Sequence, residues 1–114
     1  MITAESRRSI VEFLKVLADT TRLEILEILK ENELPSSTIQ KKLHRSQSTT
    51  SKHLNMLLDN NLINFEKRDN IKYYRLNSNI NIENLINQIN SIVITINKER
   101  LKDIRDADII DTLS

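Results

Sequence analysis

The chain of 114 residues contains no glycine, and this absence limits where it can make tight turns. A turn with a positive φ angle must then use asparagine or aspartate, which also tolerate the left-handed conformation. Two asparagines at 60–61 follow an apolar helical segment, where a left-handed helix end is expected. Asp69 and Asn70 separate two strand-like runs, 62–67 and 71–77. The sequence therefore predicts a β-hairpin that turns at this pair.

Upstream of the hairpin, apolar residues recur at spacings of three and four, which is typical of helices. A first helix is predicted over residues 4–18, followed by a second that Asp19 is placed to cap. Ser36 is a predicted cap for a short third helix, and Ser46 for a fourth that runs to about residue 59. Two helices joined by such a brief turn form a helix-turn-helix, and the hairpin after them is a wing.

Downstream of the hairpin, isoleucine, leucine and valine recur at spacings of three, four and seven, which predicts a long helix with a coiled-coil-like seam. The β-branched run 92–96 locally favours strand, so only the periodicity of the whole segment favours helix there. The end, 102–114, is either a last helical turn or a loose tail. This seam and the apolar face of the first helix predict a homodimer interface. The residues assigned to it are Ile10, Phe13, Leu14, Ile82, Leu85, Ile86, Ile89, Ile92, Val93 and Ile96.

These elements predict a mainly α fold with a small β-hairpin (α+β), in the order of four helices, two strands and one long helix. The length suits one folded unit. We therefore expect a single winged helix-turn-helix domain over residues 1–114, with dimerisation helices at both ends.

Positive charge is concentrated on the helix-turn-helix and the wing. Residues 36–75 hold eight Lys and Arg against three Asp and Glu, a net charge of +5, while the rest of the chain has a net charge of −4. Residues 36–58 hold no acid at all. A basic surface confined to one module is what neutralisation of DNA phosphates requires, so double-stranded DNA is the expected partner.

Composition argues against several other classes of protein. The chain has no cysteine and only two histidines, so neither a disulfide framework nor a metal site is expected, and no cofactor is predicted. There is no glycine-rich phosphate loop and no set of nucleophile, histidine and carboxylate, which argues against an enzyme. No secretion signal and no run of about 18 apolar residues occurs, so a cytoplasmic protein outside the membrane is expected.

Three stretches of the sequence resemble the ArsR/SmtB family of bacterial and archaeal repressors. They read LADTTRLEIL at 17–26, SQSTTSKHL at 46–54 and KYYRL at 72–76, and the resemblance covers roughly residues 8–100. It implies a dimer built from the first and last helices, with the fourth helix in the major groove of DNA. Many members of this family sense metals through cysteines near the third helix, where this chain reads LPSST at 34–38. The family's metal ligands are therefore missing, and the inducer stays open.

Short polar side chains crowd the first turns of the fourth helix, the part of a recognition helix that reaches base edges. Gln47 suits adenine, and the methyl group of Thr49 or Thr50 suits thymine. For Ser48 and Ser51, a hydrogen bond that caps the helix or bonds back to its backbone is an equal alternative to base contact. Tyr73 and Tyr74 alternate across a strand, so one is expected in the core and the other near the DNA backbone. The predicted DNA contacts are Ser36, Lys41, Arg45, Gln47, Ser48, Thr49, Thr50, Lys52, His53, Lys67, Arg68, Lys72 and Tyr73.

The expected function is therefore sequence-specific DNA binding by a homodimeric transcription regulator, most simply a repressor, on an inverted-repeat operator. Two alternatives stay open at this point. A winged helix can serve as a protein-interaction module without touching DNA. A MarR-like regulator shares the same pattern of helices and hairpin, although its terminal helical extensions usually need a longer chain.

Overall fold

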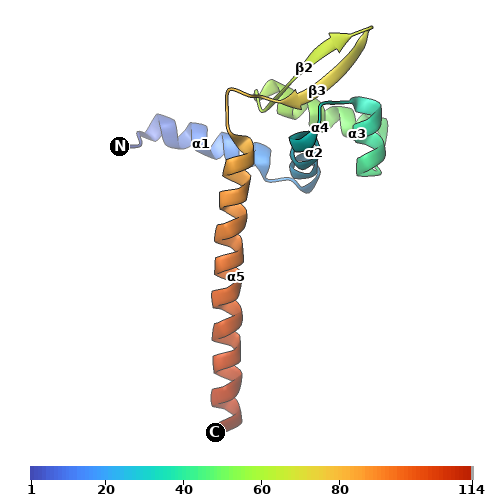
Figure 1. Cartoon of the computed structure of the whole chain (residues 1–114). Helices are drawn as coiled ribbons and strands as arrows, with labels where there is room; N and C mark the ends of the chain where they lie inside the picture. Colours follow the sequence, from blue (N-terminus) through green and yellow to red (C-terminus); the bar gives the residue numbers. More distant parts are fainter. Residues whose placement is uncertain (114) are drawn as a thin grey trace. The chain divides into compact units, whose positions relative to one another are not determined.

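The computed structural model describes the backbone of residues 1–113 and the side chains of residues 1–106, and it is mainly helical with a small sheet (Figure 1). The elements are α1 (Ala4–Leu17), α2 (Thr20–Glu31), β1 (Leu34–Pro35), α3 (Ser36–Leu43), α4 (Gln47–Asp59), β2 (Ile63–Arg68), β3 (Ile71–Leu76) and α5 (Ile82–Leu113). They confirm the predicted class and order. The chain divides into two compact units, Met1–Ile82 and Glu83–Ser114. A single domain over the whole chain stays a prediction.

Two of the three predicted helix caps are confirmed. The Oδ1 atom of Asp19 accepts a hydrogen bond of 3.0 Å from the backbone N–H of Arg22 at the start of α2. The hydroxyl of Ser46 accepts one of 3.1 Å from the N–H of Thr49 at the start of α4. The third prediction was wrong: Ser36 is the first residue of α3, and the cap position belongs to Pro35, which has no side-chain group for a cap bond.

Positive φ angles occur largely where the absence of glycine predicted them. Asn61 has a φ of 61°, and Asp69 and Asn70 at the hairpin turn have φ values of 51° and 65°. Asn60 stays on the negative side, with a φ of −102°. The turn between α3 and α4 adds a case that was not predicted, because His44 takes a φ of 54° and its N–H bonds back to the end of α3.

The sheet has three antiparallel strands in the order β1-β3-β2, one more than the predicted hairpin. Leu34 and Pro35 pair with Tyr74 and Tyr73, so β1 joins the start of α3 to the inner strand of the wing. In the hairpin itself, Phe65 lies opposite Tyr74 and Lys67 lies opposite Lys72. Since alternate residues of a strand share a face, Lys67 and Lys72 are on the same face as the buried Tyr74.

The core of the first unit is formed by the buried sides of α2, α3 and α4 together with the base of the hairpin. On α4, the positions Thr50, Leu54 and Leu57 are buried at spacings of four and three. A helix that buries one side in this way turns its other side outward. The packing of α4 therefore decides which of its polar residues are able to meet a partner.

The second unit is the helix α5 beyond Ile82, and the β-branched run 92–96 is helical within it. Periodicity over the whole segment therefore prevailed over local strand preference, as predicted. The backbone stays helical through residue 113, which answers the open question about the end of the chain. None of the helices within the described residues is long and apolar enough to span a membrane.

The cap of α2 gives a testable prediction about stability. Replacing Asp19 with alanine should lower the free energy of unfolding by about 1 kcal/mol, because an N–H at the start of α2 loses its acceptor. Asp19→Asn keeps an acceptor and should cost less. Urea denaturation at fixed protein concentration measures both variants. Equal losses would show that the cap bond is not what Asp19 contributes.

The same carboxylate predicts a dependence on pH. The hydrogen bond from the backbone of Arg22 lowers the pKa of Asp19 below its ordinary value of 3.8. A lowered pKa in the folded state adds stability above pH 3.8, and that stability is lost as the pH falls through the folded-state pKa. Asparagine does not titrate, so the stability of Asp19→Asn should fall less than that of the unmodified chain as the pH is lowered below about 4.

Candidate nucleic-acid interface

The outward side of α4 presents polar side chains. Gln47, Ser48 and Lys52, all predicted contacts, are exposed. Ser51, for which base contact was one of two equal alternatives, is exposed as well, and so is Asn55; neither was among the predicted contacts. Ser51 follows Ser48 by three positions and Asn55 follows Lys52 by three, which places them on the same side of the helix, so periodicity alone was enough to find them.

Thr50 does not belong to this surface. Only 1% of it is exposed, and its hydroxyl donates a 2.9 Å hydrogen bond to the backbone carbonyl of Ser46. Neither its methyl group nor its hydroxyl is free to meet a base. The predicted base contact at Thr50 is therefore corrected to a core position, because this residue continues the buried side of α4 formed by Leu54 and Leu57.

A cluster of hydroxyl groups closes the start of α4. The hydroxyl of Ser46 donates to that of Thr49 at 2.9 Å and lies 3.2 Å from that of Ser48. Ser48 and Thr49 thus have a capping partner inside the chain, which matches the capping alternative for Ser48. Gln47, which takes no part in this cluster, is the side chain of the first turn best placed to bind outward.

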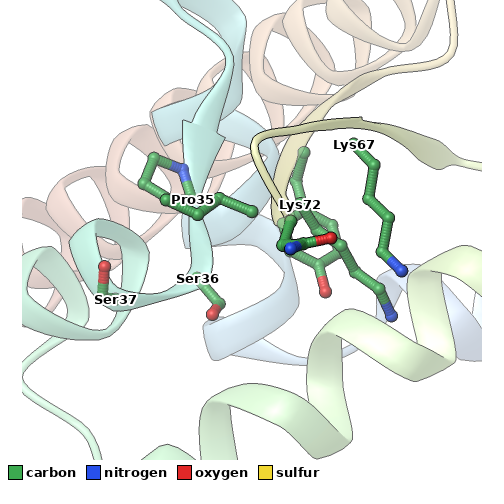
Figure 2. A pocket seen from close by; sticks show the side chains of 8 residues that line it. Pro35, Ser36, Ser37, Lys67 and Lys72 are labelled. Atoms are coloured by element: carbon green, nitrogen blue, oxygen red, sulfur yellow. The ribbon is translucent and has the colours of Figure 1, made fainter.

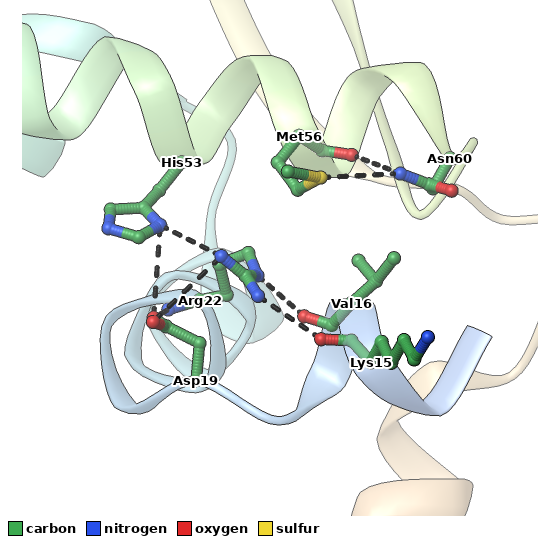
Figure 3. Close-up of polar contacts among 7 residues, drawn as sticks. All are labelled: Lys15, Val16, Asp19, Arg22, His53, Met56 and Asn60. Atoms are coloured by element: carbon green, nitrogen blue, oxygen red, sulfur yellow. Dashed lines mark hydrogen bonds and ion pairs between the residues drawn. The ribbon is translucent and has the colours of Figure 1, made fainter. Parts of the chain in front are cut away.

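His53 lies on the inner side of α4 and faces α2 (Figure 3). Its Nδ1 atom is 3.2 Å from a guanidinium nitrogen of Arg22 and 3.8 Å from a carboxylate oxygen of Asp19. Because a guanidinium only donates hydrogen bonds, Nδ1 is the acceptor in its contact with Arg22. The His53 side chain is 13% exposed. Its burial and its contacts indicate that His53 positions α4, in place of the DNA contact predicted for it.

Arg22 connects this network to the first helix, as Figure 3 shows. Its Nε donates to the carbonyl of Val16 at 2.6 Å, and one terminal nitrogen donates to the carbonyl of Lys15 at 3.2 Å. These carbonyls lie at the end of α1, where no helical donor follows them. The guanidinium also lies 3.9 Å from the carboxylate of Asp19. Arg22 therefore joins α1, α2 and α4.

The wing has two faces with different charge arrangements. Lys67 and Lys72 are cross-strand neighbours on one face, and neither forms an ion pair within the described side chains. Lys72 also places its ammonium nitrogen 4.7 Å from the centre of the Phe65 ring. Two like charges directly opposite each other repel, so this face favours an anion between or beside them.

On the other face of the wing, the arginines bond to carboxylates of the chain itself. Arg68 donates to Glu33 at 2.7 Å and stacks over the ring of Tyr73, with 4.1 Å between the guanidinium carbon and the ring centre. Arg75 bonds to Glu66 at 3.1 Å. Arg68 and Tyr73 therefore lie on the opposite face of the wing from Lys67 and Lys72. The four residues, all predicted DNA contacts, do not form one surface.

The remaining predicted contacts are all exposed: Ser36 at the start of α3, Lys41 in its last turn and Arg45 in the turn before α4. Tyr74 is the tyrosine of the core and Tyr73 is half-buried, as the alternation predicted. On the predicted dimer seam, Ile10, Leu14, Ile89 and the isoleucines after it are exposed, whereas Ile82 is only 4% exposed and belongs to the core.

Known proteins share both the sequence and the fold of this chain. The profile of the bacterial regulatory proteins of the arsR family matches residues 19–64. The chain is 36% identical over 87 residues to the arsenical resistance operon repressor of Staphylococcus aureus, which covers 76% of this chain and 83% of that protein. The chain belongs to the ArsR family. It is a transcription regulator with the family's winged helix-turn-helix fold and not an enzyme.

Two further relatives extend the comparison. The transcriptional activator HlyU of Vibrio cholerae is 38% identical over 68 residues, which covers 60% of this chain and 63% of that protein. A structure of HlyU matches with a TM-score of 0.69 at 30% identity, covering 79% of this chain and 97% of that one. A homodimeric winged helix-turn-helix DNA-binding domain from Mycobacterium bovis matches at a TM-score of 0.60 and 20% identity over 87% of this chain and 91% of that one, which supports the fold alone.

The sequence left two kinds of DNA-binding regulator open, an ArsR-type and a MarR-like one. Membership of the ArsR family decides for the first. Among the side chains described, no three histidine, cysteine, aspartate or glutamate residues gather in a way that suits a metal ion. That no metal acts on this chain stays a prediction.

Proposed function

We propose that this ArsR-family chain acts as a homodimeric repressor that recognises an inverted-repeat operator through α4 and holds the DNA backbone through the wing. The observation that carries the proposal is the outward face of α4, which is polar and free of acid from Gln47 to Asn55. The unpaired Lys67 and Lys72 supplement it. A DNA duplex presents both base edges and phosphates, and this module offers a match to each.

Base reading falls to the exposed residues of α4. Gln47 and Asn55 carry amide groups, which can form paired hydrogen bonds to adenine, and Lys52 suits guanine. Ser51 lies between them with a hydroxyl that serves either base type. Thr50 is left out because it is buried. The proposed reading surface is therefore Gln47, Ser51, Lys52 and Asn55.

Backbone contacts fall to cations around this helix. Lys41 and Arg45 are exposed before α4, and Lys67 and Lys72 are exposed on the wing. Arg68 is held by Glu33, so its proposed role is to support the wing. Phosphate contacts add affinity for any sequence and make binding dependent on salt.

The dimer is proposed from the apolar side chains that each unit exposes. On α1 these are Ile10, Val11 and Leu14, and α5 adds a series from Ile89 to Ile104. So many exposed aliphatic side chains are uncommon on a monomer that stays soluble. A two-fold dimer would present two copies of α4 to DNA. The operator would then contain two half-sites arranged as an inverted repeat.

The test separates base reading from backbone binding. Operator fragments are first selected from genomic DNA, and affinities are then measured by fluorescence anisotropy on operator and scrambled duplexes at several salt concentrations. Gln47→Ala should weaken operator binding by roughly 1 to 3 kcal/mol and scrambled binding little. Lys72→Gln should weaken both and reduce the salt slope by about one unit.

Matched controls lie on the exposed surface of α5. Gln88→Ala and Lys102→Gln make the same chemical changes outside the proposed DNA interface. They should leave the affinities for the operator and for the scrambled duplex unchanged. Equal losses on both duplexes for Gln47→Ala would refute direct reading by α4. No DNA binding by the unmodified chain at low salt would refute the proposal and favour a protein-interaction role.

A further inference from the structure

A cavity of about 370 Å³ lies between the start of α3 and the wing (Figure 2). Its lining includes Pro35 and Ser36 from the start of α3, and Lys67, Ile71, Lys72 and Tyr74 from the wing. The cavity exists because β1 draws the start of α3 against β3. Its volume is in the range of sites for small molecules.

The polar side of the cavity attracts anions. Lys67 and Lys72 extend from neighbouring strands toward the same side, as Figure 2 shows. None of the described lining residues is acidic. The nearby carboxylates of Glu33 and Glu66 bond to arginines of the opposite face of the wing. The two ammonium groups therefore lack a counter-charge, and an anion bound here would relieve their repulsion.

The other side of the cavity is apolar. Pro35 and the ring of Tyr74 supply carbon surface. Burial raises the pKa of Tyr74 above its ordinary value of 10.0, so its hydroxyl is a neutral donor at pH 7. Contact with a phosphate of a DNA backbone needs no apolar wall of this kind. A small molecule with an anionic head and a carbon body would use both sides.

We propose that this cavity binds a small organic phosphate monoester, and that the bound ester releases DNA because it occupies Lys67 and Lys72. The phosphate group lies between the two ammonium groups, within reach of the Ser36 hydroxyl, and the ester group packs on the apolar wall. The release step rests on the proposed function, in which the same lysines hold DNA phosphates. The binding step does not depend on it.

The binding step is tested without DNA, with phenyl phosphate as the probe and inorganic phosphate as its smaller counterpart. Calorimetry should show one saturable site per chain, with phenyl phosphate binding more tightly than inorganic phosphate. The double variant Lys67→Gln, Lys72→Gln should weaken binding at least about tenfold, because two charge-assisted contacts are lost. Lys98→Gln, Lys102→Gln removes the same charge from α5 and should bind like the unmodified chain.

Three results would overturn the binding step: no saturable binding, equal affinity in the wing double variant, or equal affinity for both probes. The release step is tested by adding phenyl phosphate to the operator complex at constant ionic strength, with sodium chloride in the matched control. Phenyl phosphate should weaken DNA binding more than chloride does. Release equal to that by chloride overturns this step and leaves the proposed function intact, whereas a chain that never binds DNA refutes the proposed function and leaves the calorimetry unaffected.

Discussion

Replacing Ile89 with glutamate should convert the proposed dimer to monomers or unfold it. Ile89 is 39% exposed on α5 and lies on the seam with Ile92 and Ile96, which are 59% and 50% exposed. Two-fold symmetry would place the new carboxylate in the interface twice. Burying two unpaired charges should cost about 4 kcal/mol or more per dimer, which raises the dissociation constant about a thousandfold.

Sedimentation velocity measures the oligomeric state, and circular dichroism reports whether the chain stays folded. Asn87→Glu is the matched control, because two residues turn about 200° around a helix and so place Asn87 away from the seam. The control should sediment like the unmodified chain. A folded dimer of Ile89→Glu at micromolar concentration would show that α5 does not form the interface.

The same variant should also weaken operator binding far more than scrambled binding. A single α4 can read only one half-site, so a monomer loses the gain that comes from two linked sites. A monomer that keeps full operator affinity would contradict the inverted-repeat proposal while leaving the reading surface of α4 in place.

Much of the fold was predictable because its signals are local. Asp19 and Ser46 are caps that satisfy a helix within three residues, and Asp69 and Asn70 supply a hairpin turn in a chain without glycine. The strand β1 was not predictable in this way. It is two residues long, it contains a proline, and it forms only because β3 is already present beside it. No local pattern announces such a pairing.

The candidate interface was predictable in kind and less so in its members. Residue types on α4 identified a polar recognition helix, but its burial assigned Thr50 to the core and revealed Ser51 and Asn55. A stricter use of helical periodicity would have found all three. The pairing of Arg68 with Glu33 is different, since 35 positions separate them in the chain. Contacts that span such a distance come from the tertiary fold.

Arg22 makes the tertiary connection on which the placement of α4 depends. Arg22→Ala should lower the free energy of unfolding by roughly 2 to 4 kcal/mol, because the carbonyls of Lys15 and Val16 lose their donors and His53 loses its partner. Urea denaturation at fixed protein concentration measures this loss. Arg8→Ala, at an exposed position of α1, removes the same side chain and should change stability by less than about 0.5 kcal/mol.

Arg22→Lys separates the charge of Arg22 from its geometry. Lysine keeps the positive charge near Asp19, but a single ammonium does not reproduce the planar fork that serves two carbonyls and His53 at once. We therefore expect Arg22→Lys to recover less than half of the stability lost in Arg22→Ala. In the folded fraction, it should also weaken operator binding while leaving scrambled binding unchanged, since α4 is shifted and the phosphate contacts of the wing remain. Full recovery by lysine would mean that charge alone matters at this position, and α4 would then need another anchor.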